Sequence, residues 1–118
     1  MIFRKLLRTA LVALRMVPKP RFVIRVADRQ PGAKQLVSGE VVAVRGARGP
    51  KWACFLCPCG SGEVVRLALD RDTRPLWNLE VDRLGRPTLN PSIWQLDGCR
   101  CHFWIRRGEI TWCGNSDE

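Results

Sequence analysis

The stretch Phe103-Trp104-Ile105-Arg106-Arg107-Gly108-Glu109-Ile110-Thr111-Trp112 (residues 103–112) decides the fold class. Two runs rich in aromatic and β-branched residues flank an Arg-Gly pair, and this pattern is typical of a β-hairpin. Six further runs of this kind precede it, bounded by Gly, Pro or Asn, at residues 21–26, 37–45, 52–57, 63–69, 77–81 and 92–95. The sequence therefore predicts a mainly β protein, a small antiparallel sheet or barrel-like domain.

The opening MIFRKLLRTALVALRMVPKP has a different period. Apolar residues recur every three or four positions with basic residues between them, which predicts an amphipathic helix ended by Pro18. Its longest uncharged run, Thr9 to Leu14, is shorter than the about 7–15 apolar residues of a secretory leader. We expect a basic amphipathic helix at residues 1–20, one compact domain at residues 21–118, and a cytoplasmic location. The helix either packs one face on the domain or contacts an acidic surface, whether lipid, nucleic acid or a protein partner.

The length and the charge of the chain restrict the class of protein and the place where a charged partner can bind. The chain has 118 residues, which matches a single domain of about 100–200 residues and excludes a multidomain enzyme. The formal net charge is +9, but residues 1–27 contain seven bases and no acid. The remaining residues hold 13 Lys and Arg against 11 Asp and Glu. An electrostatic partner is therefore expected to meet the N-terminal element.

Six cysteines suggest a metal site. They fall in three places: Cys54, Cys57 and Cys59, then Cys99 and Cys101, and last Cys113. Thiolates one residue apart on a Pro-Gly turn can face one ion, and zinc prefers four tetrahedral ligands. Three disulfides are the alternative, but no export signal is visible and three cysteines within six residues suit a metal better than bridges.

We therefore expect a zinc-stabilised domain in which Cys57, Cys59 and Cys99 bind the ion. The fourth ligand is Cys101, Cys54 or Cys113. Four cysteine ligands leave no position for water, so Zn²⁺ would be structural. A catalytic zinc with three protein ligands, including His102, is the alternative.

The only histidine, His102, must take part in any serine–histidine chemistry. Ser92 follows Asn90-Pro91 at the predicted start of a strand, a rigid position that suits a nucleophile. The short connection from Gln95 to Gly98 can place Ser92 and His102 on adjacent strands. Both residues also have structural explanations, because histidine can ligate zinc and serine is common at strand starts.

A third group often orients the imidazole of such a pair. The candidates are Asp97 in the same connection and Glu80 or Asp82 from the preceding strand. Three tryptophans would either line a substrate groove or belong to the core, namely Trp77, Trp94 and Trp104. The residues leave these alternatives open.

Three segments together resemble the BubE-like family of bacterial proteins. They are Phe-Leu-Cys-Pro-Cys-Gly (55–60), Thr-Leu-Asn-Pro-Ser-Ile (88–93) and Gly-Cys-Arg-Cys-His-Phe-Trp-Ile (98–105), followed by a Gly turn and Ile-Thr-Trp (110–112). The resemblance covers residues 52–112. Members look like small zinc-stabilised serine proteases, encoded beside a ubiquitin-like modifier and its conjugation enzymes. It implies a peptidase or deconjugating hydrolase whose partners are a ubiquitin-like protein and its conjugation machinery.

The resemblance also implies residue roles. It makes Ser92 the nucleophile and His102 the general base, and it assigns three cysteines to the metal, Cys57, Cys59 and Cys99. This chain departs from the family pattern at Ser61, where a third cysteine is common, and at Cys101, where a serine is common. These departures favour Cys101 or Cys54 as the fourth ligand. The alternative function is a noncatalytic zinc-binding adaptor that recruits a protein partner or, less favoured, nucleic acid; redox chemistry by the cysteines is the least favoured.

Overall fold

The computed structural model describes residues 2–14, 19–70, 76–96 and 98–113. Within them the chain forms one α-helix, one 3-10 turn and eight strands. Their bounds are α1 Ile2–Ala13, β1 Val23–Ala27, η1 Ala33–Gln35, β2 Glu40–Gly46, β3 Gly49–Leu56, β4 Val64–Ala68, β5 Asn78–Val81, β6 Pro87–Trp94, β7 His102–Arg106 and β8 Glu109–Trp112. The prediction of a mainly β fold with an N-terminal helix is confirmed.

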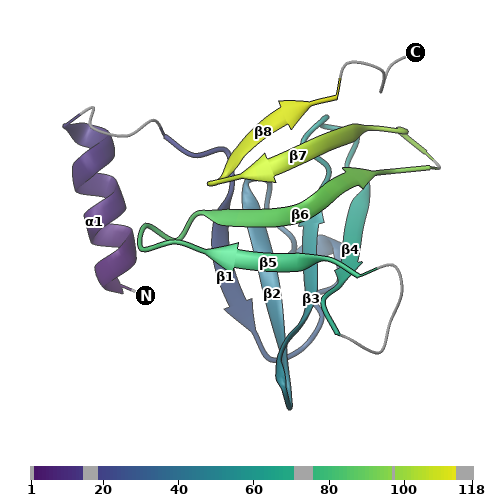
Figure 1. Ribbon diagram of the computed structural model, residues 1–118, viewed down its shortest axis with the longest axis horizontal. Coiled ribbons are helices and arrows are strands. Elements are labelled where there is room, and N and C mark those ends of the chain that lie inside the picture. The colour runs from purple at the N-terminus through teal and green to yellow at the C-terminus, as the bar shows by residue number, and fades with distance from the viewer. Residues whose placement is uncertain (1, 15–18, 71–75, 97, 114–118) are drawn as a thin grey trace.

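The strands form two four-stranded sheets rather than one sheet or barrel (Figure 1). Their orders are β1-β2-β3-β4 and β5-β6-β7-β8, so every strand pairs with its neighbour in the sequence. All these pairs are antiparallel except β1 and β2, which are parallel. The predicted hairpin is β7 and β8, and its turn residues Arg107 and Gly108 both have positive φ, 51° and 75°. A type I′ turn requires this conformation at both positions.

The two sheets face each other across the main core. The buried members of this core are Phe22, Val41, Ala53, Phe55, Cys57, Val65, Leu67, Leu89, Ile93, Phe103 and Ile105. At its centre the Phe55 ring makes edge contacts with Phe22 and Phe103, with centroids 5.3 and 6.4 Å apart. Side chains alternate across a strand, so the neighbouring residues of β6 and β7 point to the opposite face of their sheet.

The first sheet, β1 to β4, is covered on its other face as well. Val42, Val44 and Cys54 form a second buried cluster there with Leu36. The segment before β2 covers this cluster, and the Arg66 guanidinium donates hydrogen bonds to its Gln30 side chain and its Pro31 carbonyl. The second sheet, β5 to β8, therefore carries the more exposed face, and we refer to its side away from the main core as the outer face.

Strand β6 differs from the sequence prediction. It begins at Pro87 rather than Ser92, and Asn90-Pro91 lies inside it. The register with β7 passes from Leu89 opposite Ile105 to Ile93 opposite Phe103, so three residues of β6 lie opposite one of β7. Proline is tolerated within a sheet at such a bulge because it has no N–H to donate to the ladder.

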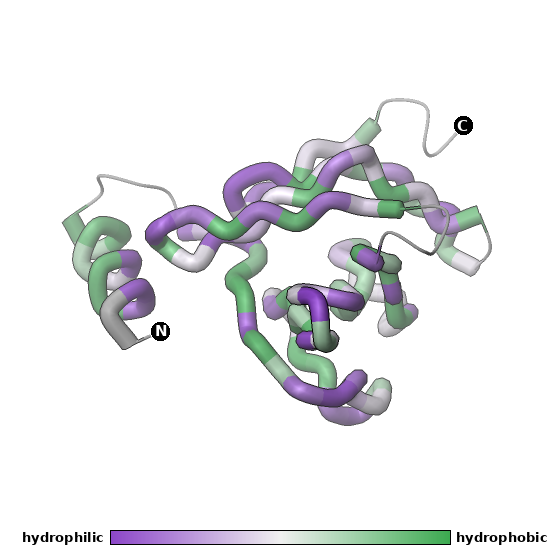
Figure 2. The backbone as a smooth tube through the Cα atoms, turned by 60° about the horizontal axis from the view of Figure 1, so that its bottom comes forward, coloured by the Kyte–Doolittle hydropathy of each residue, from purple (hydrophilic) through white to green (hydrophobic). Residues whose placement is uncertain are grey.

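The helix α1 stands beside the two sheets, as Figures 1 and 2 both show. Leu6 and Leu14 are 63% and 68% exposed, whereas Leu7 and Leu11 are half-buried, so part of the apolar face of the helix is open to solvent. The two expected roles of the helix, packing on the domain and contact with an acidic surface, both stay predictions, and the expected end at Pro18 lies outside the described residues. No helix in the described ranges is long and apolar enough to cross a membrane.

Candidate active site and metal centre

The Ser92 hydroxyl and the His102 imidazole meet on the outer face of the second sheet. Ser92 Oγ lies 2.9 Å from His102 Nε2, within hydrogen-bond distance. Alternate residues of β6 share a face, so Ser92 lies on the same side as Trp94, and Trp94 is the direct partner of His102 on β7. Ser92 and His102 thus lie on adjacent strands, as the sequence predicts, and their catalytic roles stay a prediction.

The bulge in β6 determines where Ser92 lies. A bulge bends its strand and re-aims the side chains within it, and Ser92 is the last residue before normal pairing resumes at Ile93. The indole N–H of Trp77 donates a hydrogen bond to the Ser92 carbonyl oxygen, at 3.3 Å. Trp77 is half-buried against the main core, so the bulge is tied to the interior of the molecule.

The imidazole of His102 is oriented by stacking. The Trp94 ring lies parallel to it, with an interplanar angle of 10° and centroids 4.9 Å apart. The Gln95 N–H donates to the Cys101 carbonyl, which makes them a hydrogen-bonded pair. The next pair, Trp94 and His102, is then a non-hydrogen-bonded pair, in which cross-strand side chains lie closest.

No carboxylate of the described residues contacts the imidazole. His102 Nδ1 is buried and has no hydrogen-bond partner in the described part of the chain. The predicted third group Asp97 lies outside the described residues. Asp82 accepts hydrogen bonds from Leu84 and Arg86 within its own turn, and Glu80 is exposed on β5. Among the described residues the site is a serine–histidine pair.

Four cysteine thiols converge a short distance away. The sulfur atoms of Cys57, Cys59, Cys99 and Cys101 all lie within 4.8 Å of one another, and those of Cys57 and Cys99 are 3.6 Å apart. A tetrahedral zinc ion with Zn–S bonds of about 2.3 Å separates its sulfur ligands by about 3.8 Å. The set therefore fits one metal ion, and all six cysteines are free of disulfides.

The four thiols come from both sheets. Cys57 and Cys59 lie in the connection between β3 and β4, and Cys99 and Cys101 lie in the connection between β6 and β7. The first connection is a tight turn in which the Gly60 N–H donates to the Cys57 carbonyl. An ion at this centre would thus link one sheet to the other.

The alternative ligands lie elsewhere. Cys54 is buried in the second cluster, beneath the Arg66 guanidinium at 3.5 Å. Cys113 follows β8, and its backbone N–H donates to the His102 carbonyl. His102 Nε2 faces Ser92 rather than the thiols, and His102 is not in the cysteine group. Cys101 is therefore the candidate for the fourth ligand that the structure brings to Cys57, Cys59 and Cys99.

A family model described as bacterial ubiquitination-like system serine protease (BubE) matches residues 26–113. The chain belongs to the BubE family. The resemblance stated from sequence is confirmed, and the match is longer than residues 52–112. It includes the serine–histidine pair and all four converging thiols, whereas α1 lies outside it. No curated protein and no solved structure matches the chain.

In this BubE family member the thiols have unequal proton affinities. Burial raises the pKa of Cys57 well above its usual range, and burial with hydrogen bonding to Cys59 and Cys99 raises that of Cys101 to about 12. Burial also raises the pKa of Cys59, but hydrogen bonds from the side chain and backbone of Ser61 outweigh it and, with those from Cys57 and Cys101, lower it to about 6. Cys59 is therefore a thiolate at neutral pH, the form that binds metal. Ser61, one of the departures from the BubE pattern, contributes directly to this.

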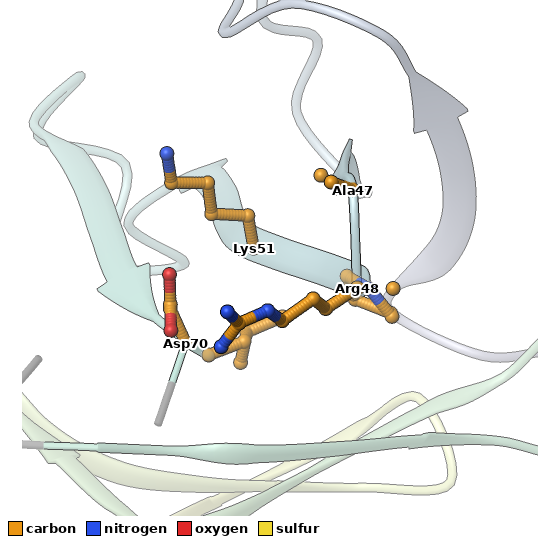
Figure 3. A pocket seen from close by; sticks show the side chains of 8 residues that line it. Ala47, Arg48, Lys51 and Asp70 are labelled. Atoms are coloured by element: carbon orange, nitrogen blue, oxygen red, sulfur yellow. The ribbon is translucent and has the colours of Figure 1, made fainter. Parts of the chain in front are cut away.

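A cavity of about 600 Å³ lies away from this BubE site, at the hairpin between β2 and β3 (Figure 3). Its lining includes Ala47, Arg48, Lys51 and Asp70, and the Arg48 side chain extends toward Asp70. Neither Ser92 nor His102 lines it. The serine–histidine pair thus lies on a sheet face separate from this cavity.

Two tryptophans of this BubE chain have contacts at the site that the sequence did not predict. Trp77 and Trp94 were expected only in a substrate groove or in the core, whereas the Trp77 indole donates to the Ser92 carbonyl and Trp94 stacks on His102. The spacing of Trp94, two residues after Ser92, was the available signal, because it places both on one strand face. Trp104 shares the outer face with His102, and the Arg106 guanidinium lies 4.2 Å from its ring centroid.

Proposed function

We propose that this BubE family member is a serine peptidase that cleaves the chain at the C-terminal end of a ubiquitin-like protein. Ser92 is the nucleophile and His102 is the general base. The observation that carries the proposal is the 2.9 Å separation of Ser92 Oγ and His102 Nε2, because a base must lie within hydrogen-bond reach of the proton it takes. Membership of a family described as serine proteases of a ubiquitination-like system supports the substrate class.

The reaction proceeds in two halves. Ser92 Oγ attacks the scissile carbonyl carbon while its proton passes to His102 Nε2, and the imidazolium returns that proton to the leaving amine or alcohol. The product is an ester between Ser92 and the modifier. Water then attacks this ester, giving its proton to His102, and the proton returns to Ser92 as the modifier leaves with a free carboxylate.

The exposed position of the pair suits a protein substrate. Trp94 is 54% exposed beside His102, and Trp104 lies on the same face of β7. Tryptophan rings give a large apolar contact area with a hydrogen-bonding edge. We propose that these two rings bind the segment of the modifier around the cleaved bond.

Zinc is the metal proposed for the four thiols. An all-thiolate set favours zinc over hard cations such as magnesium or calcium, and four protein ligands leave no site for a reacting water. The ion would hold the connections on either side of the core. Because Cys101 directly precedes His102, it would also fix the start of β7.

The test is cleavage of a fusion between the cognate modifier and a C-terminal extension, followed by gel electrophoresis and mass spectrometry. We expect the unaltered chain to cut at the end of the modifier and Ser92→Ala to lose at least about a thousandfold in kcat/KM. Ser38→Ala, an exposed serine away from the site, is the matched control and should cleave normally.

A fluorophosphonate probe supplies a second measurement. It should label the unaltered chain on Ser92 and leave Ser92→Ala unlabelled, with metal content the same in both proteins. Normal cleavage by Ser92→Ala would disprove the serine mechanism. An unaltered chain that binds the modifier without cutting it would instead support the noncatalytic adaptor.

A further inference from the structure

The helix α1 has two distinct faces. Leu6, Ala10 and Leu14 are spaced four residues apart, so they form one stripe along the helix. All three are exposed in the structure. Arg4 and Arg8 form a second stripe, in which Arg4 is exposed and Arg8 is half-buried. Leu7 and Leu11, which lie between the two stripes, are half-buried as well, whereas the stripe of Leu6, Ala10 and Leu14 is in contact with solvent.

A specific contact fixes this orientation. The Arg8 guanidinium donates a hydrogen bond to the Leu84 carbonyl, at 2.9 Å, in the turn between β5 and β6. That turn is rigid because the Asp82 carboxylate accepts the Leu84 and Arg86 N–H groups. A Cβ on Gly85 would lie 3.0 Å from the Arg8 guanidinium, so a side chain there would crowd the contact. The domain thus lies on the side of α1 that carries Arg8, and the stripe of Leu6, Ala10 and Leu14 points away from it.

The charge of this segment identifies the surface that the stripe can meet. Arg4 and Lys5 are exposed on α1, and Lys19 and Arg21 are exposed just after it. No Asp or Glu occurs in residues 1–27. Basic helices with one apolar face lie in the interface of membranes with anionic lipids, apolar side down. A groove in a protein partner would accept the leucines, but it would not account for a segment with seven bases and no acid.

We propose that α1 is a peripheral anchor that binds the surface of an anionic lipid bilayer. The stripe of Leu6, Ala10 and Leu14 inserts among the lipids, and the basic residues contact the head groups. The stripe lies on the side of α1 away from the domain, so insertion requires no rearrangement of the sheets. The anchor is proposed independently of the peptidase activity, because α1 lies outside the matched residues 26–113 and contributes no residue to the serine–histidine pair.

The test is co-sedimentation of the full chain with vesicles. We expect binding to vesicles of phosphatidylcholine mixed with phosphatidylglycerol, weak binding to phosphatidylcholine alone, and a decrease with added salt. Leu6→Asp should lower the partition coefficient at least about tenfold, because it places a charge in the apolar stripe. Thr9→Asp is the matched control, since it adds the same charge at an exposed polar position, and it should lower binding less than about threefold.

Each other result would overturn the anchor. These results are failure of the unaltered chain to sediment with anionic vesicles and equal losses for Leu6→Asp and Thr9→Asp. Binding of an acidic protein that Leu6→Asp abolishes, with no binding to vesicles, would assign the stripe to a protein partner instead. Circular dichroism should show that both variants are folded. Leu6→Asp should cleave the modifier fusion in solution at the normal rate, so failure of the anchor and failure of the peptidase are distinguishable.

Discussion

The His102 ring stacks on the Trp94 indole, and no carboxylate of the described residues contacts it. Its Nδ1 is buried without a hydrogen-bond partner among the described residues, and Trp94 covers one ring face. An imidazole held in this way keeps its orientation through packing and through the register of β6 and β7. The direction of Nε2 toward Ser92 then depends on the neighbouring indole.

Substitution of Trp94 tests this dependence. A well-packed aromatic pair contributes about 0.5–1.5 kcal/mol, so Trp94→Ala should lower kcat by roughly two- to tenfold. Trp94→Phe keeps a stacking ring and should retain most of the activity. Steady-state kinetics on the modifier fusion measure kcat and KM separately. A rise in KM with unchanged kcat in Trp94→Ala would show that the indole binds substrate without orienting the base.

Single residues also explain which parts of the site could be predicted. Strand alternation places Ala53, Phe55 and Cys57 on one side and Cys54 on the other, so the pattern could have excluded Cys54 as a ligand. The convergence of Cys101 could not be read from sequence, because it depends on how two loops from different sheets meet. The position of His102 Nδ1, which is buried and has no hydrogen-bond partner in the part of the chain that the structure describes, is likewise a property of the assembled site.

At the scale of elements, the hairpin turn between β7 and β8 is tightly enclosed. The Gly108 N–H donates to the Pro87 carbonyl, and the Gly108 carbonyl accepts the Phe22 N–H, both at 2.8 Å. A Cβ on Gly108 would lie 2.5 Å from the Phe22 carbonyl oxygen and 2.8 Å from Pro20 Cβ. This turn therefore joins the hairpin to β6 and to the segment before β1.

We expect Gly108→Ala to lower the free energy of unfolding by roughly 3 kcal/mol, from positive φ and backbone overlap together. Gly49→Ala is the matched control, because its φ is also positive, at 109°, but nothing lies within 4 Å of its added Cβ. It should cost only about 1 kcal/mol. Urea unfolding of both variants provides the comparison. Equal losses of unfolding free energy in the two variants would mean that the atoms around Gly108 can move to make room for the added Cβ.

The elements themselves were largely predictable, because each has a local signal. The eight apolar runs correspond to the eight strands, and the three- and four-residue period of the N-terminal segment corresponds to α1. The extension of β6 through Asn90-Pro91 was not predictable, since the bulge arises from pairing with β7. The orientation of α1 was not predictable either, because a single contact between Arg8 and the Leu84 carbonyl sets it.

At the scale of the whole molecule, the thiol centre and the helix lie at opposite ends of β6. The turn that contacts α1 precedes Pro87, and the connection that carries Cys99 and Cys101 follows Trp94. The centre joins loops of both sheets, so an ion bound there would act as a cross-link across a small core. Such ions contribute directly to folding stability in small domains.

Metal removal should therefore affect both stability and activity. We expect a strong chelator to lower Tm by at least about 10 °C and to abolish cleavage of the modifier fusion. Cys59→Ser should reduce the zinc content measured by atomic spectroscopy, whereas Cys54→Ser, outside the thiol group, should retain one ion per chain. Unchanged Tm and activity after chelation, with the metal verified as absent, would contradict a structural ion.

The short separation of Ser92 and His102 along the chain restricts how this protein can vary in length. Both residues belong to one hairpin, ten positions apart, and their contact requires the register that pairs Trp94 with His102. An insertion or deletion of one residue that moved this register would turn the imidazole toward the interior. Length changes are therefore expected to be excluded from the connection between β6 and β7 during evolution, while the exposed hairpin tip at Ala47 and Arg48 can accept them.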